Sequence, residues 1–231
     1  MITDERTAIY IESLSEPLTP ILEELETRAA KDGIPMIRKS TQSLLRYVLA
    51  ANRPEKILEI GTAVAFSAVF MATYGPGNVH IDTIENYAKR IEEAKKNIAA
   101  AGAGGAINLI EGDALEVLET LVLEQRSYDM IFIDAAKAQY PNYLPLAKRL
   151  LRDGGILVSD NVLFDGDIVQ SRFAVRRRDR TIHARMREYL RLLSEDRELV
   201  TTILPVADGM TLSVKTAAKT RGRYDGKIVK A

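Results

Sequence analysis

The sequence predicts an α/β fold in which a mostly parallel sheet carries helices on both faces. Three observations lead to this expectation. Short apolar runs alternate with segments of helical periodicity from residue 56 to residue 160, and such alternation is typical of right-handed βαβ units. The last two apolar runs are separated by a few residues that include Asp208-Gly209, a hairpin signal that favours an antiparallel final pair. No internal repeat is visible, so we expect one domain.

The segment before residue 56 is expected to be helical. Glu12–Ala30 and Thr41–Ala50 show helical patterns and would pack outside the sheet or on a partner chain. We therefore divide the chain into N-terminal helices (residues 1–55), a core (residues 56–216) and a polar tail (residues 217–231) that contains Gly222 and Gly226 and is expected to be mobile.

The core elements follow from apolar runs, helical periodicity and turn residues. The strands are short runs of mainly apolar residues, and the helix after the second strand has Ile91, Ala94 and Ile98 on one face with charges on the other. The pair Gly154-Gly155 is expected to break the chain before the fifth strand. Expected strands are Lys56–Ile60, Val79–Ile84, Ala106–Ile110, Met130–Asp134, Ile156–Ser159, Leu199–Pro205 and Met210–Lys215, and expected helices between them are Phe66–Tyr74, Asn86–Ala101, Ala114–Glu124 and Tyr143–Leu151.

Composition excludes several classes of protein. The 231 residues include no cysteine, which rules out disulfides and thiolate metal sites, and the formal net charge is zero. No apolar run approaches the roughly 18 residues of a membrane-spanning helix. The first residues, MITDERTAIY, are polar and acidic, unlike a signal peptide. We expect an enzyme of the cytoplasm that has no contact with a membrane.

Five acidic residues fall at or just past the ends of expected strands. Because ligands of parallel α/β sheets bind beyond the carboxyl ends of the strands, these acids are candidate binding residues. The alternative for each one is capping of the following helix, and this alternative is strongest for Asp113. The five acids are Glu59, Glu85, Asp113, Asp134 and Asp160.

The loop after the first strand predicts the type of cofactor. The sequence Glu59-Ile60-Gly61-Thr62-Ala63-Val64-Ala65-Phe66-Ser67 contains one glycine, whereas a dinucleotide loop needs several glycines so that backbone N–H groups can approach the pyrophosphate. Glu85 ends the second strand, where an acid can accept both hydroxyls of a ribose. A loop with few glycines and a ribose acid favour S-adenosylmethionine over NAD.

Several motifs in the same order and spacing resemble those of a known family. They are Glu59-Ile60-Gly61-Thr62, Phe66-Ser67, Glu111-Gly112-Asp113-Ala114, Phe132-Ile133-Asp134-Ala135-Ala136-Lys137 and Ser159-Asp160-Asn161-Val162-Leu163. Together they resemble the metal-dependent O-methyltransferases related to catechol and caffeoyl-CoA methyltransferases, over roughly residues 34–215. The resemblance implies a Rossmann-like class I methyltransferase fold with a seven-stranded sheet.

The resemblance also implies the cofactor contacts and a homodimer with the N-terminal helices near the contact. The family often has a second glycine where this chain has Ala65, so we expect a slightly displaced cofactor or loop. The residues implied to bind S-adenosylmethionine are Met36, Glu59, Gly61, Ser67, Glu85, Asp113, Ala114 and Asp134.

Asp134, Asp160 and Asn161 form an all-oxygen set at the ends of two strands that are expected to be neighbours. Such a set suits Mg²⁺ or another divalent cation, and the resemblance assigns these residues as its ligands. The resemblance further implies that Lys137, together with Asp134, is catalytic, with Lys137 taking the proton from the substrate hydroxyl. The alternatives are an ordinary turn at Asp160-Asn161 and a surface lysine. A cation bound by two substrate oxygens requires an oxygen next to the hydroxyl, as in catechols and in 5-hydroxyuridine.

An arginine-rich segment follows the proposed metal ligands. Arginine groups match phosphate geometry and stack on bases, so we expect an RNA contact, although charge runs more often form solvated helix faces. The combination of this segment with Ala136 and Phe164 is similar to the bacterial tRNA 5-hydroxyuridine methyltransferases, which implies tRNA (anticodon loop, wobble position) as partner and 5-methoxyuridine as product. The expected RNA-binding residues are Arg172, Arg176, Arg177, Arg178 and Arg180, with Arg185 and Arg187 following.

Three other functions remain open at this point. The same chemistry on a small catechol-like phenol is the main alternative. An NAD-dependent oxidoreductase would need the glycines that the loop lacks. A non-catalytic RNA-binding domain would not need Asp134, Lys137, Asp160 and Asn161 together.

Overall fold

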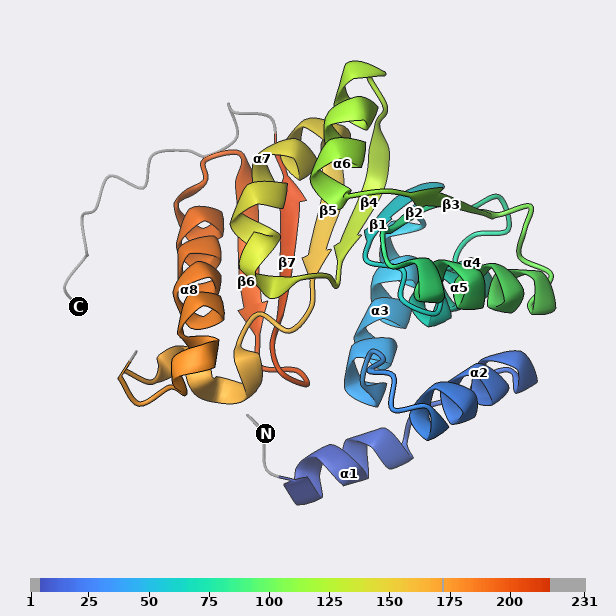
Figure 1. The fold of residues 1–231 in the computed structure, drawn as a ribbon, viewed down its shortest axis with the longest axis horizontal. Coiled ribbons are helices and arrows are strands. Elements are labelled where there is room, and N and C mark those ends of the chain that lie inside the picture. Colours follow the sequence, from blue (N-terminus) through green and yellow to red (C-terminus); the bar gives the residue numbers. More distant parts are fainter. Residues whose placement is uncertain (1–4, 172, 217–231) are drawn as a thin grey trace, which may run out of the picture.

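The computed structural model describes residues 5–171 and 173–216 and contains one seven-stranded sheet (Figure 1). The strand order is β3-β2-β1-β4-β5-β7-β6. Strands β1 to β5 are parallel, and β7 pairs antiparallel with both β5 and β6. The predicted parallel sheet with a final hairpin is therefore confirmed. The bounds are β1 (Lys56–Ile60), β2 (His80–Glu85), β3 (Ile107–Glu111), β4 (Tyr128–Ile133), β5 (Leu151–Ser159), β6 (Leu199–Leu204) and β7 (Met210–Lys215).

Two buried clusters hold helices against the two faces of the sheet. Side chains alternate between the faces of a strand, so Met130 and Phe132 of β4 belong to one cluster, and Ile131 and Ile133 belong to the other. The first cluster contains α2 (Pro20–Lys31), α3 (Lys39–Asn52), α4 (Phe66–Tyr74) and α5 (Ala88–Ala100), and the second contains α6 (Ala114–Leu123), α7 (Tyr140–Leu150) and α8 (Arg180–Glu195).

The N-terminal prediction of one helix over Glu12–Ala30 is wrong. The structure has α1 (Glu5–Ser13) and α2, with a break between them that contains Pro17. Proline lacks the backbone N–H and disfavours helical geometry in the residue before it, whereas Pro20 fits the first turn of α2. Helix α1 and the residue that follows it expose four large apolar side chains, which are Ile9, Tyr10, Ile11 and Leu14. The expected homodimer stays a prediction.

Two boundaries in the second half also differ from the prediction. Helix α7 begins at Tyr140, three residues before the expected start, because Pro141 is well suited to the first turn of a helix. Strand β5 begins at Leu151 and runs through the glycine pair, with an irregularity in its register against Tyr128 and Met130 of β4. Residues 152–155, which include the glycine pair, have no register partner in β4, and regular pairing resumes at Ile156. The predicted mobile tail, residues 217–231, lies outside the described residues.

Within residues 5–171 and 173–216, the search for a helix with the length and apolar character of a membrane span finds none.

Candidate active site

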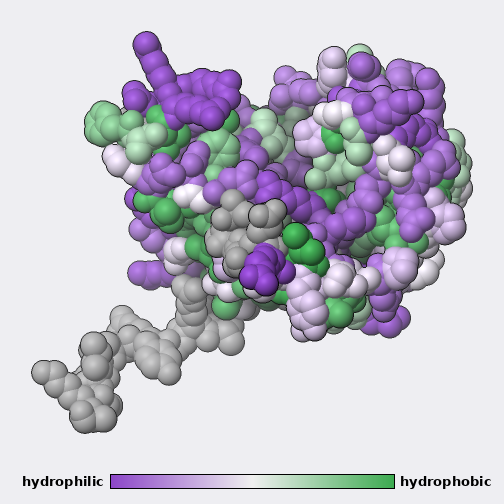
Figure 2. Space-filling view, turned by 90° about the horizontal axis from the view of Figure 1, so that it is seen from below, coloured by the Kyte–Doolittle hydropathy of each residue, from purple (hydrophilic) through white to green (hydrophobic). Residues whose placement is uncertain are grey.

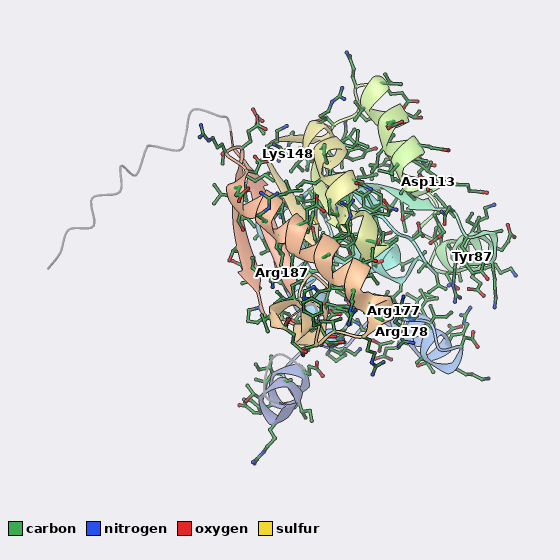
Figure 3. All side chains as sticks on the ribbon, turned by 60° about the vertical axis from the view of Figure 1, so that its left-hand side comes forward. Tyr87, Asp113, Lys148, Arg177, Arg178 and Arg187 are labelled. Atoms are coloured by element: carbon green, nitrogen blue, oxygen red, sulfur yellow. The ribbon has the colours of Figure 1, made fainter. Side chains whose placement is uncertain are left out.

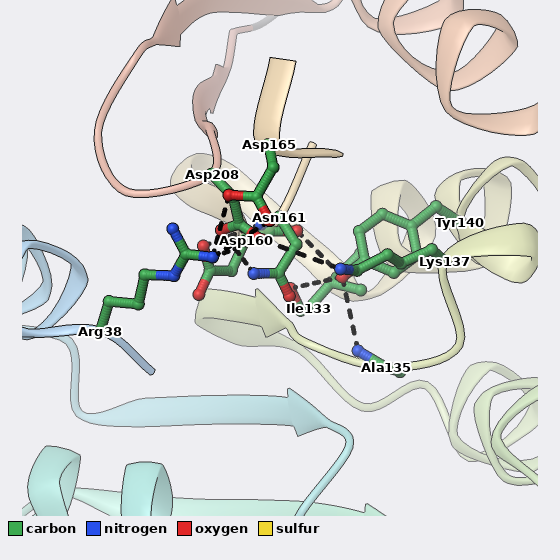
Figure 4. Close-up of polar contacts among 9 residues, drawn as sticks. All are labelled: Arg38, Ile133, Ala135, Lys137, Tyr140, Asp160, Asn161, Asp165 and Asp208. Atoms are coloured by element: carbon green, nitrogen blue, oxygen red, sulfur yellow. Dashed lines mark hydrogen bonds and ion pairs between the residues drawn. The ribbon is translucent and has the colours of Figure 1, made fainter. Parts of the chain in front are cut away.

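Asp134 and Asp160 lie side by side at the carboxyl edge of the sheet because their strands are in register. Ile133 pairs with Ser159, so the next residue of each strand is an aspartate. The backbone N–H of Asp160 donates to the carbonyl oxygen of Ile133 at 3.0 Å. The buried Tyr140 hydroxyl lies 3.1 Å from the Asp160 carbonyl oxygen and 3.3 Å from that of Ile133 (Figure 4). These contacts hold the two aspartates together.

Both aspartates carry an electrostatic cost. Burial, together with the charge of the neighbouring Asp134, raises the pKa of Asp160 to about 8. Burial likewise raises the pKa of Asp134 to about 6, opposed by Lys137. The side chain of Asp134 accepts no hydrogen bond from a described residue, and that of Asp160 accepts one, from the N–H of Asn161 at 2.8 Å. Oxygen atoms of both carboxylates are thus available to a positively charged ligand.

Asn161 directly follows Asp160 and carries a side-chain amide at the same edge of the sheet. Its Nδ2 donates to Oδ1 of Asp208 at 2.6 Å, and within the described part of the chain Oδ1 of Asn161 receives no hydrogen bond. Among those residues no three Asp, Glu or His side chains form a metal-binding group, so an oxygen set here depends on this amide. Asn161 has a φ of 58°, a conformation that asparagine tolerates better than most residues.

Lys137 and Arg38 approach this group from opposite sides. Lys137 begins the short helix η1 (Lys137–Gln139), and its Nζ lies 3.9 Å from Oδ2 of Asp208 and 5.5 Å from the centre of the Phe164 ring. Arg38 donates to Asp165 at 2.9 Å and lies 4.0 Å from Oδ2 of Asp208. Figure 4 shows the Asn161 amide and the carboxylates of Asp160, Asp165 and Asp208 between the two cationic side chains.

A cleft of about 220 Å³ adjoins the aspartates and contains most of the expected cofactor residues. Its walls come from the loops after β1, β2, β3 and β4, and Figure 3 labels Asp113 and Tyr87 on this side of the molecule. The Glu85 carboxylate accepts hydrogen bonds from the N–H groups of Ala63, Asn86 and Tyr87 at 2.8 to 3.0 Å. Expected residues that line the cleft are Gly61, Glu85, Asp113, Ala114 and Asp134.

Asp113 also caps a helix, as the alternative interpretation stated. Its Oδ1 accepts the N–H of Leu115 at 2.9 Å at the start of α6. Helix capping and a place in the cleft are compatible, because Oδ2 remains outside this bond.

The other three expected cofactor residues lie outside the lining of the cleft. Glu59 is fully buried in β1, and burial raises its pKa to about 8, opposed by hydrogen bonds from Ser67 and Thr83. Ser67, in the first turn of α4, is 8% exposed. Met36 packs against the first buried cluster. Glu59 and Ser67 support the loop from beneath, and direct cofactor contacts by these three residues stay predictions.

Gly61 is required by a neighbouring backbone. Its φ is +102°, and a Cβ atom there would lie 2.2 Å from the carbonyl oxygen of Asp134. Ala65 lies in the same loop, is fully buried and has a φ of 65°, a region that glycine adopts at lower cost. The loop thus forms with a strained alanine at the position where the family often has a second glycine. The slightly displaced cofactor that we expect as a result stays a prediction.

The arginine segment divides into exposed and structural residues. Arg176, Arg177 and Arg178 are exposed, and no described residue forms an ion pair with Arg176 or Arg177. Figure 3 shows Arg177 and Arg178 away from Lys148, which lies near the amino edge of the sheet. Arg180 donates to the Val175 carbonyl at 3.3 Å. Arg172 lies outside the described residues.

Arg185 and Arg187 have structural partners, so the alternative of an ordinary helix face fits them better. Arg187 donates to the Ile168 carbonyl at 2.9 Å. Arg185 donates to the carbonyl of Ala138 at 3.0 Å, which fixes α8 against the loop of Lys137. The exposed arginines therefore lie directly before α8, a helix that contacts the loop of Lys137. Figure 2 views the molecule from below the orientation of Figure 1, and it shows apolar residues interspersed among hydrophilic ones on this face.

Sequence reasoning missed Arg38 and Asp208. Asp208 is 4% exposed and was used only as a hairpin signal. Arg38 had no signal, because its partner Asp165 is 127 positions away. Both residues are found only through tertiary contacts.

The family model for O-methyltransferases matches residues 12–216, which include the sheet and every candidate site residue. The chain belongs to this O-methyltransferase family. As an O-methyltransferase it transfers a methyl group to an oxygen atom of its substrate.

Similar proteins support the assignment. A catechol O-methyltransferase of Niastella koreensis is 36% identical to this O-methyltransferase over 143 residues, which cover 61% of the chain and 65%, just under two thirds, of that enzyme. The structure of a candidate caffeoyl-CoA O-methyltransferase of Staphylococcus aureus has a TM-score of 0.84 and 30% identity, covering 91% of this chain and all of that one. The O-methyltransferase TomG of Streptomyces achromogenes, solved with S-adenosylmethionine, has a TM-score of 0.79 and 25% identity, covering 92% and 96%.

Proposed function

We propose that this O-methyltransferase uses S-adenosylmethionine and a divalent cation, Mg²⁺ above all, to methylate 5-hydroxyuridine in the anticodon loop of tRNA. The observation that carries the RNA part is the exposed arginine segment, whose helix contacts the loop of Lys137. The second candidate is methylation of a small catechol-like phenol, which the name of the Niastella relative favours.

The cleft supports S-adenosylmethionine as the cofactor. This cofactor supplies an electrophilic methyl group on a positively charged sulfur. Glu85 provides a carboxylate at the end of β2 for ribose hydroxyls, and Gly61 and Ala63 bring backbone close to the ligand. Asp134 is shared by the cleft and the aspartate pair, so the sulfonium and the substrate oxygen can be held close together, which is a large source of rate acceleration.

The oxygen set fits a hard divalent cation. The carboxylates of Asp134 and Asp160 and the amide oxygen of Asn161 belong to one edge of the sheet and have too few donors within the described chain to satisfy them. Such oxygen atoms are the ligands that Mg²⁺ prefers. When bound, the cation would favour the deprotonated form of a substrate hydroxyl.

Lys137 is proposed to take the proton of the substrate hydroxyl at Nζ. The side chain is partly buried, at 26% exposed, and it lies between Asp208 and the ring of Phe164. Asp208 and Phe164 thus restrict where the amine can reach. A positioned general base of this kind contributes about 10²- to 10⁴-fold in rate.

The segment Phe173–Arg178 supports RNA over a small phenol. Phe173 is 83% exposed, and the Arg180 guanidinium lies 5.9 Å from the centre of its ring. Exposed aromatic rings stack on unpaired bases, and unpaired arginines bind phosphates. A small phenol would need neither feature. Val175 lies between Phe173 and the arginines in the sequence, and because it is buried (3% exposed) it anchors the segment to the protein.

The test compares two triple variants on two substrates. One carries Arg176→Ala, Arg177→Ala and Arg178→Ala. The control carries Arg149→Ala, Arg191→Ala and Arg197→Ala, which removes equal charge from exposed residues near the amino edge of the sheet. Transfer of labelled methyl groups is measured into tRNA that contains 5-hydroxyuridine and into catechol.

We expect the first variant to lose at least tenfold in kcat/KM for tRNA and to bind S-adenosylhomocysteine normally. If the arginines contact single-stranded phosphates, the slope of log affinity against log salt should also fall by about 2. Catechol turnover without tRNA turnover in the wild-type protein would favour the second candidate. Equal tRNA activity of both variants would leave the segment as ordinary surface.

A further inference from the structure

Asp208 is a buried carboxylate in the turn between β6 and β7, and its contacts extend beyond the Lys137 amine that it helps to restrict. It is 4% exposed. Its Oδ1 accepts a hydrogen bond from Nδ2 of Asn161 at 2.6 Å, and its Oδ2 lies 3.9 Å from Lys137 and 4.0 Å from Arg38 (Figure 4). One carboxylate thus contacts an expected metal ligand, the expected base and a second cationic residue.

The contact with Asn161 decides which end of its amide faces the aspartates. An asparagine side chain can turn its oxygen or its NH₂ group toward a given point, and only the oxygen can bind a cation. A carboxylate flanked by two cations accepts hydrogen bonds and donates none. It therefore holds the NH₂ group toward itself and leaves Oδ1 of Asn161 for the pair Asp134 and Asp160.

The turn is fixed to the loop that it orients. The N–H groups of Val162 and Leu163 donate to the carbonyl oxygens of Gly209 and Asp208, both at 2.9 Å. Gly209 has a φ of +97°, and a Cβ atom there would lie 2.3 Å from the Leu163 side chain. The backbones of the turn and of the loop are therefore held together, which keeps the Asp208 carboxylate within reach of the Asn161 amide.

We propose that Asp208 is a positioning residue that fixes the Asn161 amide for cation binding and is not itself a cation ligand. Oδ1 is used by Asn161, and Oδ2 faces Lys137 and Arg38. The inference rests on the cation site of the proposed function. Partners that orient metal ligands typically matter by 10- to 100-fold in metal affinity.

The experiment measures Mn²⁺ affinity by electron paramagnetic resonance on protein saturated with S-adenosylhomocysteine. Asp208→Asn keeps the shape but lets the new amide donate to Oδ1 of Asn161, so we expect at least tenfold weaker Mn²⁺ binding with unchanged affinity for S-adenosylhomocysteine. The matched control is Asp165→Asn, which removes an exposed carboxylate bonded to the same Arg38. The control should bind Mn²⁺ within twofold of the wild type.

A reciprocal exchange restores both the charge and a hydrogen bond between the two positions, whereas Asp165→Asn accounts for loss of charge alone. In the double variant Asn161→Asp with Asp208→Asn, the new amide donates to the new carboxylate, and one oxygen of residue 161 again faces the aspartates. We expect this variant to recover most of the Mn²⁺ affinity that Asp208→Asn loses. The exchange also keeps a hydrogen bond between the two positions, so it tests the idea even if Asp208→Asn alone does not fold.

Three results would overturn the inference. They are wild-type Mn²⁺ affinity in Asp208→Asn, an equal loss in Asp165→Asn, and no recovery in the double variant. A wild-type protein that binds S-adenosylhomocysteine but no divalent cation would instead remove the cation site from the proposed function, and this inference with it.

Discussion

Replacement of Gly61 by alanine should disrupt both the cofactor loop and the position of Asp134. The new methyl group would lie 2.2 Å from the Asp134 carbonyl oxygen and 2.9 Å from its carbonyl carbon. Neither atom belongs to a flexible side chain, so β1 and the end of β4 must separate. The N–H of Asp134 donates to the Ile60 carbonyl at 3.1 Å, and this bond would be strained in the process.

The expected cost comes from two contributions. An alanine at a φ of +102° costs about 1–2 kcal/mol relative to glycine. Overpacking against fixed neighbours adds about 1–3 kcal/mol. The sum is roughly 2–5 kcal/mol of unfolding free energy, or about 4–20 °C in Tm for a chain of this size. The affinity for S-adenosylhomocysteine should fall as well, because the separated backbones line the cleft.

The assay is chemical and thermal unfolding together with calorimetry of S-adenosylhomocysteine binding. Gly77→Ala is the matched control, since a Cβ atom at Gly77 would meet nothing within 4 Å. The control should unfold within about 1 kcal/mol of the wild type. The reasoning is refuted if Gly61→Ala matches this control in both stability and affinity.

Two further substitutions test groups in the site. Burial raises the pKa of Glu59 from 4.5 to about 8, so its stabilising contribution is complete below pH 4.5 and is lost as pH rises to about 8. The unfolding free energy of Glu59→Gln should therefore rise relative to that of the wild type as pH increases across this window, by at most about 1.4 kcal/mol per pH unit. Urea titrations in which the difference between the two proteins does not change with pH would contradict this. Lys137→Ala should lower kcat by at least about 100-fold and leave the affinity for S-adenosylhomocysteine within threefold of the wild type. Methyl transfer and calorimetry measure these two quantities, with the exposed Lys89→Ala as control. An active Lys137→Ala variant would show that Lys137 is not the general base.

The sequence predicted the sheet well because its signals are local. Helix α4 and strands β1 and β7 have the predicted bounds, since each combines an apolar run with adjacent turn residues. The same local reasoning failed at Pro17 because a periodic pattern continued across a residue that ends a helix. It also did not foresee that Leu151 pairs with Tyr128, so that β5 begins before Gly154-Gly155, although regular pairing with β4 resumes only at Ile156.

The candidate site was predictable only in part. Residues at strand ends could be found because the parallel sheet brings all carboxyl ends to one edge, and Gly61, Glu85, Asp113 and Asp134 do meet at one cleft. Asp208 could not be found this way. It reaches Asn161 across 47 positions, through a strand that runs opposite to the others, and its Asp-Gly pattern already had a sufficient explanation as a turn.

The charges around Asn161 indicate why this arrangement suits methyl transfer. Within the described part of the chain, Asp160, Asp165 and Asp208 face two cationic side chains, Lys137 and Arg38, and Asp134 lies beside Asp160. A divalent cation would offset the remaining negative charge, and it would do so beside Asp134, which also borders the cofactor cleft. The oxyanion of a substrate would then be the one unbalanced charge, and the sulfonium of the cofactor is its natural partner. During the transfer, the methyl donor loses its positive charge and the oxygen loses its negative charge. A site that is neutral in its own groups therefore stabilises the approach of the two reactants and does not oppose their mutual neutralisation.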